Sequence, residues 1–180
     1  MFCKNRTMSL VYAVFLLLNT QAFASEKKEG LSDKLSMFEG YLGTWQASFD
    51  VAKDKPPVTD VSKWERALNG NALRTLHSIN NGEYGGESLI FFDNTKQQIV
   101  FYYFTTAEFF TTGTIEIVSG NEFIAYEDVT GNENGITKVK STSTLVDNTI
   151  QVSTAYFKQG TWTDPEARTY RRTTKKVIFK

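Results

Sequence analysis

The amino-acid sequence predicts an all-β protein, in which a single antiparallel up-and-down β-barrel of about ten strands is closed at one end by a short N-terminal helix. Between residues 42 and 52, large or apolar side chains such as Trp45 and Phe49 alternate with polar ones. A period of two is typical of a strand with one buried face. About nine further stretches of this kind follow, separated by turns too short for the crossover helices of a parallel sheet. The spacing leaves a two-sheet sandwich open as an alternative, although the long Greek-key connections typical of sandwiches are not found.

Residues 1–24 have the organisation of a secretory signal peptide. A positively charged start is followed by an apolar run over 10–18, and the sequence Ala-Phe-Ala at 22–24 fits a cleavage site. The run of roughly nine residues is far shorter than the roughly 20 that span a bilayer. We therefore expect cleavage near Ala24 and a single domain over 25–180, located in the periplasm or outside the cell.

The domain is expected to begin with a short helix at 33–41. Ser32 offers an N-cap, and Leu35, Phe38 and Leu42 follow at helical spacing. This helix would lie across one end of the barrel.

The strand candidates are rich in Thr, Val, Ile, Tyr and Phe, and turn residues end each of them. Asn-Gly pairs between alternating stretches are strong hairpin signals, as at Asn69-Gly70 and Asn81-Gly82. The predicted strands are 42–52, 59–68, 72–79, 87–93, 98–106, 111–118, 122–130, 136–146, 149–158 and 167–179.

The short helix followed by Gly43-x-Trp45 on the first strand and a series of hairpins resembles the lipocalin and fatty-acid-binding (calycin) superfamily of barrels. The resemblance implies that Trp45 lies at the closed end of the barrel, with an arginine from a late strand packed over its ring. Arg168, Arg171 and Arg172 are the candidates for this cation–π contact.

A closer resemblance is to small bacterial lipocalin-like domains of unknown function. They share the Leu-Gly-x-Trp opening, a tryptophan on the second strand (Trp64), an aromatic-Asp turn (Phe92-Asp93) and an aromatic strand after it, and the likeness covers most of 38–175. Nitrobindin-type barrels are similar in outline and bind haem iron through a histidine on a late strand. The sequence has no histidine after His77, so the resemblance does not extend to haem.

The charge and cysteine content exclude several classes of site. Two of the 20 basic residues, Lys4 and Arg6, but none of the 20 acidic ones, belong to the signal, so the rest of the chain has a formal charge of −2. This balance gives no basic excess for nucleic-acid binding. The only cysteine, Cys3, is also in the signal, so no disulfide or thiolate metal site is expected. No cofactor, metal centre or membrane span is predicted.

A catalytic site has few possible members. His77 is the only histidine, so a di-histidine metal site is excluded, and no serine lies in a Gly-x-Ser-x-Gly pattern. Acid–base chemistry would require an inward carboxylate, for which Glu116, Glu122, Glu127 and Asp128 on neighbouring predicted strands are candidates.

Aromatic side chains are the most informative feature of the sequence. In the predicted strand 98–106 they occupy both faces, which indicates cover on both sides. A ten-stranded barrel is too wide for side chains to fill, so an aromatic-lined cavity with a few polar tips is expected. Tyrosine hydroxyls and His77 would supply the polar groups of the cavity, and Arg172 would be an inward-pointing cation that binds a carboxylate of the ligand. The candidate ligand-binding residues are His77, Phe101, Tyr103, Tyr126, Tyr156 and Arg172.

The function expected from these patterns is binding of a small apolar or amphipathic molecule in the lumen, without catalysis, by a monomer or homodimer. Two alternatives stay open. One is an enzyme on the same barrel that uses an inward carboxylate with His77 or a tyrosine. The other is an interaction module that presents Phe109, Phe110 and the outer aromatic face of 98–106 to a partner.

Overall fold

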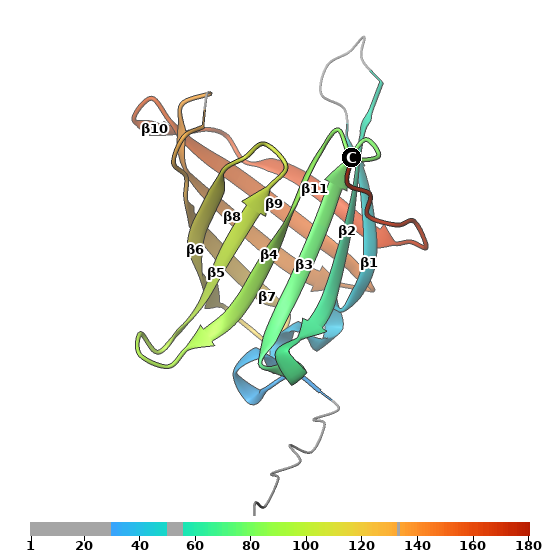
Figure 1. The fold of residues 1–180 in the computed structure, drawn as a ribbon, viewed down its shortest axis with the longest axis vertical. Helices are drawn as coiled ribbons and strands as arrows, with labels where there is room; N and C mark the ends of the chain where they lie inside the picture. Colours follow the sequence, from blue (N-terminus) through green and yellow to red (C-terminus); the bar gives the residue numbers. More distant parts are fainter. Residues whose placement is uncertain (1–29, 50–55, 133) are drawn as a thin grey trace, which may run out of the picture.

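A computed structural model describes residues 30–49, 56–132 and 134–180 of the chain. Its strands curl into a closed barrel, with the N-terminal helical segment across the lower end (Figure 1). The expected signal peptide lies outside the described residues. The strands are β1 (Gly43–Phe49), β2 (Val58–Ala67), β3 (Ala72–Ile79), β4 (Tyr84–Asp93), β5 (Gln98–Thr105), β6 (Phe110–Ile117), β7 (Glu122–Asp128), β8 (Ile136–Val146), β9 (Thr149–Lys158), β10 (Thr161–Trp162) and β11 (Glu166–Arg172).

The sheet is antiparallel throughout and closes on its first strand. From β1 to β9 each strand pairs with the next one in the chain, and β9 also pairs with β11. β11 returns to β1 through the pairs Trp45–Arg172 and Gln46–Arg171. Ten strands therefore form the wall, which confirms the predicted up-and-down barrel and excludes the sandwich. The two-residue β10 was not predicted and pairs only with β9, as a short extension of that hairpin.

The predicted short helix is present as a 3₁₀ helix, η1 (Asp33–Tyr41), and it closes one end of the barrel. Its residues Phe38 and Tyr41 are fully buried and pack their rings against Trp64 of β2 and Phe123 of β7. The indole nitrogen of Trp45 donates a hydrogen bond of 2.7 Å to the carbonyl of Tyr41. An aromatic plug thus seals the end of the barrel at which β1 begins.

Arg172 is the late-strand arginine that packs on the tryptophan. Its guanidinium lies 3.6 Å from the centre of the Trp45 ring and donates to the carbonyls of Gly40, at 3.0 Å, and Leu42. Gly43 has a φ of 118°, and a Cβ there would meet this guanidinium, so glycine is required on both counts. One side chain of the last strand therefore ties η1 and β1 together.

Asparagines adopt the left-handed conformations that the hairpin turns require. Asn80 and Asn81 join β3 to β4 with φ of 48° and 59°, and Asn148 joins β8 to β9 with φ of 60°. Asn tolerates this region better than most residues, which is why the turn signals in the sequence were informative.

The last predicted strand, 167–179, was too long. β11 ends at Arg172, and the segment 173–180 leaves the wall and crosses the outside of β1 and β2 toward the far end of β3 (Figure 1). There the backbone nitrogen of Ile178 donates to the hydroxyl of Ser78 at 3.1 Å, and the Phe179 ring lies beside Gly85. The segment covers the wall and does not extend it.

Strand β5 carries aromatic side chains on both faces, and only the inner ones are enclosed. Phe101 and Tyr103 point into the barrel, whereas Tyr102 and Phe104 point outward with 41% and 49% of their surface exposed. Phe110 of β6 lies beside Phe104, at a ring separation of 6.0 Å, and is 56% exposed. Phe91 of β4 stacks on Tyr102 at a ring separation of 6.3 Å, so in the described part of the chain the outer rings contact one another and are otherwise exposed.

No helix among the described residues has the length and apolar character needed to cross a bilayer.

Candidate ligand cavity

Two adjoining cavities lie inside the barrel among the described residues. The outer one, toward the end away from η1, has a volume of about 380 Å³, and the inner one has a volume of about 270 Å³. They share five lining residues: Thr75, Tyr103, Glu127, Ser141 and Val152. The outer volume alone falls within the range of about 300–1,000 Å³ typical of small-molecule sites.

The inner cavity has a mostly apolar lining. Trp64, Ile90, Phe101, Ile115 and Phe123 contribute most of its large side chains. All five are buried or half-buried and belong to the cluster that packs against η1. The aromatic plug is therefore the floor of this cavity.

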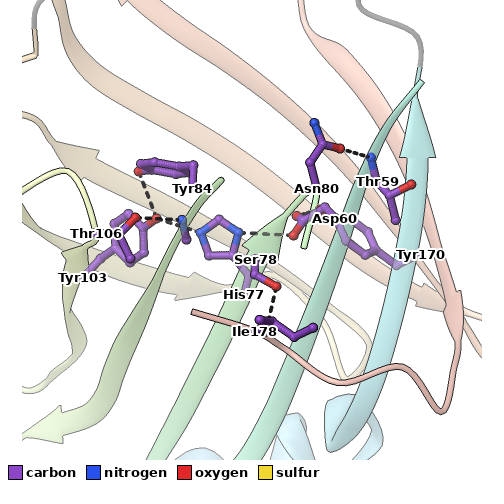
Figure 2. A network of polar contacts seen from close by, with 11 residues as sticks. Thr59, Asp60, His77, Ser78, Asn80, Tyr84, Tyr103, Thr106, Tyr170 and Ile178 are labelled. Atoms are coloured by element: carbon purple, nitrogen blue, oxygen red, sulfur yellow. Dashed lines mark hydrogen bonds and ion pairs between the residues drawn. The ribbon is translucent and has the colours of Figure 1, made fainter. Parts of the chain in front are cut away.

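A chain of hydrogen bonds crosses the wall of the outer cavity from β11 to β4 (Figure 2). Tyr170 donates to Asp60 at 2.8 Å, and the second oxygen of Asp60 lies 3.2 Å from Nδ1 of His77. The Nε2 atom of His77 is 2.7 Å from the hydroxyl of Tyr103, which donates to the hydroxyl of Tyr84 at 3.1 Å. Every member of this network is already bonded within the protein.

Local strand geometry brings these groups together. His77 on β3 pairs with Gly86 on β4, and a Cβ at Gly86 would collide with the ring of Tyr103. The missing side chain lets that ring lie against β4 with its hydroxyl at His77. Asp60 lies on β2, two residues before the strand partner of His77, and therefore on the same inner face.

The tyrosines of the network are neutral hydrogen-bond donors. Burial raises the pKa of Tyr103 and of Tyr170 far above the usual tyrosine value, and the neighbouring carboxylate of Asp60 acts in the same direction on both. Burial also raises the pKa of Tyr84. The cavity therefore presents phenol groups that do not ionise, which suits recognition better than nucleophilic chemistry.

Glu127 is the inward carboxylate. Of the four acidic candidates on these strands, Glu116, Glu122 and Asp128 do not line either cavity, whereas Glu127 lines both. It accepts a hydrogen bond from the hydroxyl of Thr111. Burial raises the pKa of Glu127, an effect that this hydrogen bond and the nearby His77 oppose.

The cation in the outer cavity is Arg168, not Arg172. Arg168 is in phase with Arg172 on β11 but lies four residues earlier, at the level of the cavity. Its guanidinium pairs with Glu166 at 2.9 Å and lies over the Phe49 ring at 4.1 Å. The expectation of Arg172 as the inward cation is corrected, because Arg172 is held on Trp45 at the closed end.

Four of the six predicted ligand-binding residues lie at the cavities. His77, Tyr103 and Tyr156 line the outer one, and Phe101 lines the inner one together with Tyr103. Tyr126 lies on the outside of the barrel, 37% exposed, where its hydroxyl donates to Glu116. It is adjacent to Glu127 on β7, so the two side chains necessarily take opposite faces.

Sequence reasoning missed several cavity residues: Asp60, Tyr84, Thr111, Arg168 and Tyr170. The period of two places Arg168 and Tyr170 on the face of Arg172, and this signal could have found them. Tyr84 was missed because the two glycines after it suggested a turn, so the strand was predicted to begin at 87 and not at 84.

No protein-family model matches the chain, and no curated protein matches it either. The fold and the cavity are therefore the observations from which a function can be argued.

Replacing Glu127 with glutamine is expected to stabilise the protein at neutral pH. Because the folded-state pKa of Glu127 is raised above its ordinary value of 4.5, the folded state holds its proton more tightly than the unfolded state does. The stability of the unmodified protein therefore falls as the pH rises from about 4.5 through the folded pKa. Glutamine carries no charge and removes this loss.

Urea unfolding measured across this pH window checks the expectation. The Glu127→Gln variant should gain stability relative to the unmodified protein as the pH rises. Glu116→Gln, which removes a carboxylate from the exposed outer face, is the matched control. A pH-independent difference between Glu127→Gln and the unmodified protein would contradict the expected burial effect.

Proposed function

We propose that this protein is a lipocalin-like binding barrel that holds a small amphipathic molecule in its lumen without transforming it. The observation that carries the proposal is the division of the lumen into an outer cavity with polar groups and an inner apolar cavity that share a wall. A ligand with a polar head and an apolar tail matches this division. Burial of the tail would contribute about 25 cal/mol for each Å² of apolar surface removed from water.

Binding is preferred over catalysis because of the hydrogen-bond network. An Asp60–His77–Tyr103 row would suit proton transfer if its last member had an accessible hydroxyl of lowered pKa. Here the pKa of Tyr103 is raised and its hydroxyl is bonded to both His77 and Tyr84. The row fixes the shape of the cavity wall, which is the role that we assign to it.

Export is part of the proposal. The support is the signal-like pattern of residues 1–24. In the periplasm or outside the cell, such a barrel would carry or sequester its ligand.

A fluorescence titration with the amphipathic probe N-phenyl-1-naphthylamine tests the proposal, with two variants on the same strand. Ala125 on β7 lines the inner cavity, so Ala125→Phe should fill it and weaken probe binding at least tenfold. Its neighbour Ile124 takes the opposite face, so Ile124→Phe should bind as the unmodified protein does.

Equal binding by both variants would place the probe outside the lumen and contradict the proposal. Failure of the unmodified protein to bind the probe, together with native mass spectra free of any co-purified molecule, would contradict it as well.

A further inference from the structure

The head of the ligand can be inferred from the charges in the outer cavity, provided that the binding function proposed above is correct. We propose that the ligand is an apolar molecule with a protonated amine, and that Glu127 is the residue that binds this amine. The hydrogen bonds and charges around Glu127 support this proposal.

The two carboxylates that line the outer cavity differ in how many of their oxygens are hydrogen-bonded. Both oxygens of Asp60 have partners, since one is bonded to Tyr170 and the other to His77. Glu127 receives a hydrogen bond from Thr111 at one oxygen, Oε1. Among the described residues no group donates to the other oxygen, although the side chain borders both cavities. Glu127 is half-buried, so a donor or a cation at this oxygen would offset part of the cost of removing the carboxylate from water.

The cavity cannot supply that cation itself. Arg168 is the arginine that lines it, and its guanidinium is already paired with Glu166 and packed on Phe49. His77 is close enough to lower the pKa of Glu127 but is hydrogen-bonded to Asp60 and Tyr103. A cation in direct contact with the free oxygen of Glu127 can therefore come from a ligand.

The surroundings of Glu127 favour a cation over an anion. The side chains around the outer cavity that titrate or carry charge are Asp60, His77, Tyr84, Tyr103, Glu127, Tyr156, Arg168 and Tyr170. Arg168 is paired with Glu166, and Asp60 is bonded to His77 and Tyr170, so Glu127 is the carboxylate without a cation in direct contact. Tyrosine rings can also stabilise an ammonium group through their π-faces. A ligand carboxylate would meet like charges without a free cation to balance them.

The same strand directs the tail of the ligand. On β7 the inward side chains are Glu127, Ala125 and Phe123 in order toward η1, and all three line the inner cavity. An amine held at Glu127 therefore has the apolar cavity directly beside it, so that one ligand can satisfy the carboxylate and bury its tail at once.

Three probes with the same unbranched tail separate the possibilities: decylamine, decan-1-ol and decanoate. Each is titrated as a competitor of N-phenyl-1-naphthylamine against the unmodified protein, Glu127→Gln and Glu116→Gln, all at neutral pH. The amine should bind the unmodified protein at least tenfold more tightly than either other probe. Glu127→Gln should lose at least tenfold in amine affinity and retain that for the alcohol, which also shows that the variant is folded. Glu116→Gln should bind all three as the unmodified protein does.

Decanoate binding as tightly as decylamine, or full amine affinity in Glu127→Gln, would overturn the amine inference and leave the lumen-binding function standing. The inference is also overturned if the fluorescent probe binds but none of the three competitors displaces it. If neither the fluorescent probe nor any competitor binds, the proposed function fails, and the inference fails with it.

Discussion

Replacing Phe38 with alanine is expected to lower the free energy of unfolding by about 4 kcal/mol. Phe38 is fully buried in η1 and packs against Tyr41, Trp64 and Phe123. Its removal leaves a void at the centre of this ring cluster, because the closed end of a barrel cannot collapse around the gap. Urea or thermal unfolding of the variant measures the loss.

Two further variants make this result specific. Phe38→Leu keeps most of the buried volume and should cost clearly less. Phe110→Ala removes the same ring from the exposed outer face and should change stability by less than about 0.5 kcal/mol. A loss below about 1 kcal/mol for Phe38→Ala would mean that η1 does not seal the barrel. Because Trp64 and Phe123 also line the inner cavity, ligand affinity should fall together with stability.

Replacing Arg172 with alanine is expected to cost about 2 kcal/mol of stability. The change removes the guanidinium from the Trp45 ring and breaks its hydrogen bonds to Gly40 and Leu42. Those carbonyls lie in the last turn of η1 and at Leu42, which joins η1 to β1, so the end of the barrel should loosen. Denaturant unfolding gives the magnitude, and hydrogen exchange of the 40–46 amides shows whether the loss is local.

The chemistry of the arginine can be separated from its charge. Arg172→Lys keeps the charge but not the planar fork, so it should recover only a small part of the loss. Arg171→Ala, at the adjacent position with its side chain on the opposite face, should be nearly neutral. Full recovery by lysine would show that the charge alone, and not the stacked geometry, closes the barrel.

The wall of the barrel could be predicted because its strands alternate and its turns use asparagine and glycine. Where a strand has apolar residues on both faces, alternation cannot say which face is inside. On β7 the inner face could consist of Phe123 and Ala125 or of Ile124 and Tyr126. Only the pairing of β7 with its neighbouring strands shows which of these two sets points inward. For this reason Tyr126 was placed inside, and Glu127 remained one of four candidates.

The position of a side chain along the barrel axis is a second property that alternation does not predict. Arg168 and Arg172 have the same phase, yet one lines the outer cavity and the other lies on Trp45. Their levels depend on the register between β11 and β1. The same register explains why the segment 173–180 is not part of a strand, although its apolar residues 177–179 resemble one. The backbone nitrogen of Thr173 donates to the carbonyl of Thr44, and β1 begins one residue earlier, at Gly43. Residues beyond this point therefore have no part of β1 to pair with.

The pairing of β1 with β11 also sets an order of events during folding. The strand made first can complete its hydrogen bonds only with the strand made last, about 120 residues later along the chain. A nascent chain that has not yet released β11 has two open sheet edges, one at β1 and one at β9, and such edges are the usual starting points of aggregation. Pairing of β11 with both β1 and β9 removes these two edges at once.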